Sequence, residues 1–281
     1  MDTKNGRASG ASKKRTGVSI ITCTKRPEYL ANVFHNYARQ LWPKKELIII
    51  VNHDRANLER YRKMAKRYKN VVVYRLPQKK TLGACLNFAV KKAKYDFIAK
   101  FDDDDYYAPL YVLGSLRAIM FSRADIVGKR DYYMYLKGSN VLLLRSHRSE
   151  HRFVSVVPGA TLFVRRNVFR HVRFANRNIG EDVKFCQDCK AKGFRIYSAG
   201  KRHFAAIRRK NSRNHTWRIS DRRLLAEGIK IVGVKDYRAY VRRPYLRGRI
   251  SSSMPGANLG FREANPLFPS NLSSRVWFGR E

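Results

Sequence analysis

The sequence predicts an α/β protein with a doubly wound, mostly parallel central sheet, flanking helices and an irregular C-terminal extension. Over the first hundred residues, short β-branched and apolar segments alternate with amphipathic helical segments. Such alternation favours parallel strands whose connecting helices cover both faces of the sheet. Three of the apolar segments end in polar residues. In a parallel sheet these ends share one edge, which is where ligands bind in such folds.

Apolar runs are interpreted as strands and segments with helical periodicity as helices. In the first half, the expected strands are 18–23, 47–51, 71–75 and 97–101, and the expected helices are 28–40, 58–68 and 82–93. In the second half, the expected helices are 109–124, 168–172, 181–193 and 220–227, and the expected strands are 132–136, 140–144, 161–164, 196–198, 229–234 and 237–241. No GxGxxG or Walker-type motif follows any strand, so a phosphate group must be held by another device, such as a divalent cation.

The strand ending at Phe101 leads directly into four consecutive aspartates, Asp102 to Asp105. Adjacent carboxylates repel one another unless a cation lies among them. Oxygen ligands at this density suit Mg²⁺ or Mn²⁺. An acidic turn that closes a surface loop is the alternative. The place of this cluster at the end of a buried strand favours the ligand-binding interpretation.

The chain is strongly basic. Its 60 Lys and Arg residues against 21 Asp and Glu residues give a formal net charge of +39 over 281 residues. This charge predicts anionic partners, among them nucleotides, phosphate-bearing polymers, anionic membrane surfaces and nucleic acid, without choosing among them. The 44% of hydrophobic residues suffices for a buried core, which excludes disorder of the whole chain.

We expect three regions along the chain. Residues 1–17 are basic and polar without an apolar signal segment, and are expected to be a disordered arm or, alternatively, a tether to an anionic surface. Residues 18–243 are expected to form the main domain. Residues 244–281 are turn-rich but carry apolar residues, which predicts a tail packed on the domain or on a partner.

Cysteine usage and hydropathy predict the compartment. Four cysteines suggest a reducing environment, and Cys186 and Cys189 are interpreted as ordinary helix residues, because no second ligand pair has matching spacing. No stretch of about 18 consecutive apolar residues predicts a membrane-spanning helix. We therefore expect a cytoplasmic protein, with peripheral attachment to a membrane left open.

A second acidic pair, Glu181 and Asp182, follows Gly180 at the start of a predicted helix. Acids are favoured there by the helix dipole, which explains them without a function. The functional interpretation is a general base beside a metal site.

A basic loop, 208–218, holds a histidine and a tryptophan. It is interpreted as a solvated face, an RNA-binding patch with a stacking aromatic, or a lid that clamps a diphosphate.

Five segments carry a resemblance: 18–27, 82–87, 101–105 followed by Pro109, 180–182 and 214–217. Their order and spacing resemble those of the family 2 glycosyltransferases with the GT-A fold, from about Val18 to about Trp217. In that family, a segment like 18–27 frames the nucleotide base, and one like 82–87 leads into the metal-binding strand. A segment like 101–105 forms the DxD motif, one like 180–182 supplies the ED motif of the catalytic base, and one like 214–217 closes over the site. The chain more weakly resembles the spore-surface glycosyltransferases of bacilli.

The resemblance implies metal-dependent transfer of a sugar from a nucleotide sugar to an acceptor hydroxyl, with inversion at the anomeric carbon. The implied cofactor is Mn²⁺ or Mg²⁺. The expected general base is Asp182, with Glu181 as the alternative. The expected metal ligands are Asp104, Asp102 and His215. The residues expected to bind the nucleotide sugar are Thr22, Thr24, Arg26, Asn52, Asp54, Asn87, Asp102, Asp103, Arg209 and Arg213.

One departure from the family pattern concerns the donor base. Many members carry two acids after the second strand, whereas this chain has Asn52-His53, with Asp54 one place later. Asparagine still offers a donor and an acceptor to a base edge, and a UDP-sugar is the expected donor. The excess positive charge predicts an anionic glycan or polymer as acceptor, at a cell, membrane or spore surface.

Two rival interpretations stay open. One is a nucleic-acid-binding protein, which explains the basic loop but not the acids at 102–105 and 182, so nucleic acid is not the expected partner. The other is a GT-A protein that has lost catalysis and serves a structural role.

Overall fold

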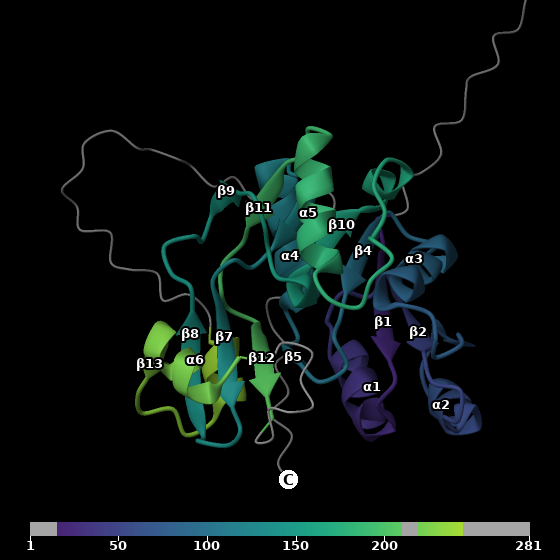
Figure 1. Cartoon of the computed structure of the whole chain (residues 1–281), viewed down its shortest axis with the longest axis horizontal. Helices are drawn as coiled ribbons and strands as arrows, with labels where there is room; N and C mark the ends of the chain where they lie inside the picture. The colour runs from purple at the N-terminus through teal and green to yellow at the C-terminus, as the bar shows by residue number, and fades with distance from the viewer. Residues whose placement is uncertain (1–15, 210–218, 244–281) are drawn as a thin grey trace, which may run out of the picture. The chain divides into compact units, whose positions relative to one another are not determined.

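Two β-sheets form the framework of the part of the chain that the structure describes (Figure 1). The computed structural model describes residues 16–209 and 219–243, all within one unit that spans Met1–Pro244. The second unit, Tyr245–Glu281, contains almost all of the predicted tail and lies outside the described residues, as does nearly all of the predicted N-terminal arm.

The larger sheet has the strand order β3-β2-β1-β4-β10-β6-β11-β9 in the described residues. Its strands are β1 (Val18–Thr24), β2 (Lys45–Val51), β3 (Val71–Arg75), β4 (Phe97–Lys100), β6 (Ile126–Gly128), β9 (Arg152–Val154), β10 (Phe163–Arg165) and β11 (Ile196–Ser198). β1 pairs in parallel with both β2 and β4, and β2 pairs in parallel with β3. The carboxyl ends of these four strands therefore share one edge, as predicted.

Helices cover both faces of this sheet, which confirms the doubly wound prediction. On one face, α1 (Leu30–Ala38), α2 (Leu58–Ala65) and α4 (Tyr111–Ser122) pack on strand residues that include Ile20, Leu47 and Ala99. On the other face, α3 (Leu82–Lys92) and α5 (Glu181–Ala191) pack on Ile21, Ile48 and Ile98. Because successive side chains of a strand point to opposite faces, strands covered on both sides are apolar throughout.

The second sheet has the order β13-β8-β7-β12-β5, in the described residues, and was not predicted as a sheet. Its strands are β5 (Tyr106–Tyr107), β7 (Tyr132–Leu136), β8 (Val141–Arg145), β12 (Phe204–Arg208) and β13 (Ile229–Ile231). β7 and β8 form the predicted antiparallel pair, and β12 lies between β7 and β5. Helices α6 (Asp221–Glu227) and α7 (Tyr237–Arg242) follow β12 and belong with the second sheet.

The prediction of a strand at 237–241 is wrong, because α7 occupies these residues. The side chain of Asp236 caps the helix by accepting a hydrogen bond from the backbone N–H of Arg238 at 2.8 Å. Tyr237, Tyr240 and Val241 then pack on the second sheet with helical spacing. The short helix predicted at 168–172 is the 3₁₀ helix η3 (Arg166–Arg170), and the remaining 3₁₀ turns of the described residues are η1 (Pro27–Tyr29) and η2 (Gly159–Thr161).

All four cysteines are free thiols. Cys186 and Cys189 lie on α5 and are buried in the core together with Cys85. Their burial among apolar side chains supports the interpretation of the Cys186 and Cys189 pair as ordinary helix residues.

Gly83, at the start of α3, allows the backbone near Ala175 to approach this helix closely. A Cβ atom at Gly83 would lie 1.8 Å from the carbonyl oxygen of Ala175. We expect Gly83→Ala to destabilise the fold by about 1–3 kcal/mol, the usual range for overpacking, and to lower the melting temperature by several degrees. Gly114→Ala is the matched control, because a Cβ there meets nothing within 4 Å. Equal melting temperatures for the two variants would contradict this account.

Candidate active site

The end of β1 and the segment after β4 meet through Asp103. Its carboxylate accepts hydrogen bonds from the hydroxyl of Thr24 at 2.5 Å and from Nε of Arg26 at 3.2 Å, and it forms an ion pair with Nη2 of Arg26. Burial raises the pKa of Asp103 to about 6, against the pull of Arg26. Burial also disfavours the charge of Arg26, but the bonds and charge of Asp103 outweigh it and raise the pKa of Arg26. At neutral pH this is an ionised, partly buried pair. It fixes the edge of the sheet where the carboxyl ends of β1 and β4 meet, which we call the rim.

Asp105 is a structural member of the aspartate segment. It is buried, and its Oδ1 accepts a hydrogen bond from the backbone N–H of Ile207 at 2.9 Å. Its backbone carbonyl accepts hydrogen bonds from the side-chain amides of Asn32 and Asn36. Burial raises the pKa of Asp105 well above its ordinary value. Asp105 thus joins β12 of the second sheet to the aspartate segment.

Asp102 and Asp104 are the more accessible carboxylates of the segment. Their side chains are 37% and 14% exposed, against 3% for Asp103. Oδ1 of Asp102 pairs with Nζ of Lys100, and Oδ2 of Asp104 pairs with Nη1 of Arg26 at 2.8 Å. Each carboxylate has a second oxygen for which the described residues give no hydrogen bond. The two oxygens belong to Asp102 and Asp104, which are close in the chain and are candidates to bind one ligand together.

A chain of contacts connects the aspartate segment to the second acidic pair. The hydroxyl of Tyr107 accepts a hydrogen bond from the backbone N–H of Asp102 at 2.8 Å and donates to the carbonyl of Ala160 at 2.7 Å. One residue earlier, the backbone N–H of Gly159 donates to Oδ2 of Asp182 at 2.8 Å. The two acidic motifs, about 80 positions apart in the sequence, therefore belong to one site.

Helix α5 presents Glu181 and Asp182 in its first turn, after Gly180 in a left-handed conformation (φ 74°). A Cβ at Gly159 would lie 2.7 Å from Oδ2 of Asp182, so the contact between them requires glycine. Oδ1 of Asp182 accepts a hydrogen bond from the backbone N–H of Val183, as a residue of the first turn does. The bond to Gly159 reaches outside the helix, and a role confined to capping does not explain it. Glu181 is buried, which raises its pKa, and the charge of Lys100 opposes this rise.

Lys100 is the site residue that the sequence analysis missed. It is 4% exposed, pairs with Asp102, and interacts electrostatically with Glu181 and Asp182. Burial lowers the pKa of Lys100, but the charges of Asp102 and Glu181 outweigh burial, and the net pKa is raised. The signal in the sequence was a lysine inside an otherwise apolar strand, where an unpaired charge is not tolerated.

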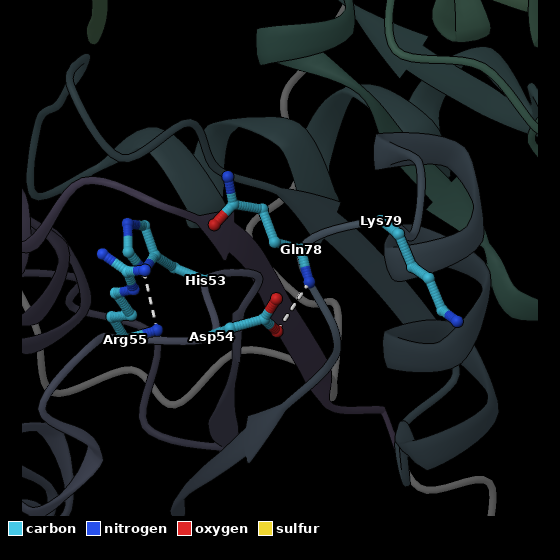
Figure 2. A pocket seen from close by; sticks show the side chains of 5 residues that line it. All are labelled: His53, Asp54, Arg55, Gln78 and Lys79. Atoms are coloured by element: carbon cyan, nitrogen blue, oxygen red, sulfur yellow. Dashed lines mark hydrogen bonds between the residues drawn. The ribbon is translucent and has the colours of Figure 1, made fainter.

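Asn52 and Asp54, two of the residues expected to bind the nucleotide sugar, follow the end of β2. A hollow of about 670 Å³ lies here, lined by His53, Asp54, Arg55, Gln78 and Lys79. Figure 2 shows the side chains of these five residues. Oδ1 of Asp54 accepts a hydrogen bond from the backbone N–H of Gln78 at 3.0 Å. The side-chain amide of Asn52 donates to the carbonyl of Pro77 at 2.7 Å. These bonds fix the wall of an open hollow beside the rim.

The remaining predicted residues are distributed unevenly. Arg209 lies near the rim, because its guanidinium and that of Arg26 both contact the ring of Tyr29, at 5.8 and 4.8 Å from its centroid. Thr22 is buried within β1. The side chain of Asn87 binds the backbone N–H and C=O of Phe174, so its polar atoms connect α3 to that segment. Arg213 and His215 lie outside the described residues, as does most of the basic loop.

Two absences apply to the described ranges only. Within residues 16–209 and 219–243, no helix has the length and apolar character needed to cross a membrane. In the same residues, no group of three or more His, Cys, Asp or Glu side chains is placed to hold a metal ion. A group of that kind supplies three or more ligands from the protein. Mg²⁺ is commonly held by only one or two carboxylates together with the phosphates of a substrate, so a site of this second type is compatible with that absence.

Comparison with known proteins identifies the family. The model of Glycosyl transferase family 2 matches residues 19–195. The fold is similar to that of S. aureus TarS 1-349, with a TM-score of 0.55 and 16% identity over 68% of this chain and 60% of that chain. It is also similar to the same protein in complex with UDP-GlcNAc, with a TM-score of 0.58 and 16% identity over 80% of this chain and 69% of that one. No curated protein sequence matches.

The chain belongs to glycosyl transferase family 2, since the family model covers more than half of it. The similarity to TarS confirms the GT-A fold that the motifs suggested. The chain spans 60% of the length of the TarS 1-349 structure, so the remainder of that protein has no counterpart in the match.

Proposed function

We propose that this protein is a metal-dependent, inverting glycosyltransferase that moves a sugar from a UDP-sugar to a hydroxyl of its acceptor. One observation carries the proposal beyond family membership. The fold brings the aspartate segment at the end of β4 and the acids of α5 into one site, where they are connected through Tyr107, Lys100 and Gly159. This arrangement offers what sugar transfer needs: a place for a diphosphate and a carboxylate to accept the acceptor's proton.

The donor is proposed from two lines of support. TarS is described in complex with UDP-GlcNAc and with UDP, and its fold is similar to the present one. In this chain, the hollow beside Asn52 and Asp54 lies at the edge of the sheet where a nucleotide binds in such folds. Thr24 and Asp103 remain proposed contributors to the base and ribose site. Thr22 and Asn87 are proposed to support it indirectly, because Thr22 is buried and the side chain of Asn87 is bonded to Phe174.

A divalent cation fits the donor set of the aspartate segment. Asp104 and Asp102 each present a carboxylate oxygen without a described partner, and Mn²⁺ and Mg²⁺ prefer such hard ligands. We propose that these two residues hold the cation, with His215 as a further ligand. When bound, the cation supplies positive charge to the departing nucleoside diphosphate. Arg26 and Arg209 supply further positive charge at the same edge. Arg213, which lies outside the described residues, stays a proposed contact of the diphosphate.

Asp182 is proposed as the general base that accepts the proton of the attacking hydroxyl. It is more exposed than Glu181, and its carboxylate is fixed by the backbone of Gly159 and Val183. Each carboxylate oxygen has a second lone pair for the proton. Glu181 is the alternative base, although its burial keeps it from the surface.

The acceptor is proposed to be an anionic glycan or polymer, at a membrane or spore surface. The net charge of +39 supports this, since one nucleotide diphosphate does not require it. We expect acceptor affinity to fall steeply as salt rises from about 0.05 to 0.5 M, because salt screens such attractions. The KM for the acceptor at several salt concentrations measures this, with the KM for the donor as the internal reference. A flat response would contradict an anionic acceptor.

A thermal-shift panel of nucleoside diphosphates, with and without Mn²⁺, tests the proposed function. A ligand that binds only the folded state at about 100 times its Kd adds about 2.7 kcal/mol of stability. We expect UDP with Mn²⁺ to raise the melting temperature most, and UDP alone to raise it less. Stabilisation by RNA but by no nucleoside diphosphate would overturn the proposal in favour of a nucleic-acid-binding protein.

A further inference from the structure

Lys100 occupies an unusual place, at the end of the central strand β4 and inside the protein. Its backbone pairs with Ile21 of β1, and Ile21 faces the side of the sheet covered by α3 and α5. Ile98, two residues earlier in β4, packs on that same side. Because side chains alternate along a strand, Lys100 extends toward α5 rather than toward α1 and α4. A lysine with 4% exposure at such a position needs partners for its charge.

The partners of Lys100 are the acids of both catalytic motifs. Its ammonium group bonds Oδ1 of Asp102 directly. It also lies within electrostatic range of Glu181 and Asp182 at the start of α5. Asp103 and Asp104 have a different cation, Arg26. These two cations therefore have different partners. Arg26 pairs with the acids next to β1, and Lys100 interacts with the acids next to α5.

We propose that Lys100 is a positioning residue of the transfer reaction, whose ammonium group holds Asp102 and the acids of α5 together in one arrangement. The inference rests on the proposed function, and it adds a role that none of the motifs identifies. Without this ammonium group, Asp102, Glu181 and Asp182 would be like charges close to one another, with Glu181 buried, and would separate. The base would then lose its place relative to the donor, and misplacement by about 1 Å is enough to lower rates about 100-fold.

The primary test compares Lys100→Met with Lys129→Met in donor turnover. Methionine is unbranched and nearly as long as lysine, and it removes the charge and the N–H donors. Lys129 is the matched control, because it is also buried, at 7% exposure, but its Nζ donates to the carbonyl of Gly200 and not to an acid of the site. We expect Lys100→Met to lower kcat by about 100-fold while the donor KM changes by less than about 10-fold, since the nucleotide edge keeps Arg26. Lys129→Met should keep kcat within about 3-fold of the wild type.

A rescue experiment separates positioning from packing. Lys100→Ala leaves a space in which ethylammonium restores the missing charge. We expect ethylammonium to restore at least about a tenth of the wild-type kcat, whereas the same concentration of sodium ions has no effect. Failure of ethylammonium to restore kcat in Lys100→Ala, or an unchanged kcat in Lys100→Met, would overturn the proposal.

A measurement that needs no turnover keeps this inference separate from the proposed function. If Lys100 and Asp102 form one unit, the double variant Lys100→Met/Asp102→Asn should melt at or above the temperature of Lys100→Met alone, because the orphaned carboxylate is gone. Additive losses of melting temperature would contradict the contact. A wild-type protein that turns over no nucleotide sugar would refute the proposed function. Equal turnover by the wild type and by Lys100→Met would refute only the role of Lys100.

Discussion

Replacing Asp182 with asparagine should abolish sugar transfer while leaving nucleotide binding intact. Asparagine matches the shape of aspartate and keeps an oxygen for the N–H of Gly159, which the carboxylate accepts at 2.8 Å. It cannot accept a proton from the attacking hydroxyl, and general-base assistance is typically worth about 10²–10⁴-fold. We therefore expect kcat to fall by that factor. The Kd for UDP with Mn²⁺, measured by titration calorimetry, should change by less than about threefold, or about 0.7 kcal/mol.

Asp188→Asn is the matched control for this prediction. Asp188 lies on the same helix, and its side chain pairs with Lys184 at the surface, where an ion pair contributes little. Its kcat should stay close to that of the wild type. If Asp182→Asn loses nucleotide affinity as strongly as rate, Asp182 holds the donor, and the base is another residue such as Glu181.

Replacing Asp104 with alanine should remove the dependence of nucleotide binding on metal. In the wild type, we expect Mn²⁺ to strengthen UDP binding at least about tenfold, or about 1.4 kcal/mol. In Asp104→Ala, the affinities with and without Mn²⁺ should coincide, because the cation loses a carboxylate ligand. The rim itself should persist, because Arg26 keeps its bonds to Asp103.

Asp96→Ala provides the control for that change, since Asp96 directly precedes β4 at the opposite end of the strand from the aspartate segment. Its metal response should equal that of the wild type. A metal response that survives in Asp104→Ala would show that another carboxylate, Asp102 first of all, holds the cation alone.

The sequence predicted the first half of the larger sheet well because strands covered on both faces are mostly apolar. β1, β2 and β4 contain such apolar runs, and the half-buried edge strand β3 begins and ends where its valines predicted it. The acidic motifs were found for a similar reason, since clustered carboxylates are conspicuous in a basic chain. Their proximity in space depends on the antiparallel pairing of β10 with β4, which brings Gly159 and Ala160 between the two motifs.

The second sheet was harder to predict, because its strands are short and depend on neighbours far away in the sequence. β5 has only two residues, and β12 joins it through pairings with no local signal. Residues 237–241 have the aromatic and β-branched composition of a strand, but the cap at Asp236 and packing on the second sheet favour a helix. Lys100 was overlooked because one lysine among 60 basic residues is inconspicuous until its burial is known.

Release of UDP shows directly whether this site transfers a sugar from a nucleotide sugar. The measurement follows UDP formed from UDP-GlcNAc and other UDP-sugars with Mn²⁺, for the wild type and for Asp182→Asn. The account predicts slow UDP release by the wild type, even with water as the acceptor, and a loss of about 10²-fold or more in the variant. Equal release by both proteins, or none from any UDP-sugar although UDP binds, would contradict it.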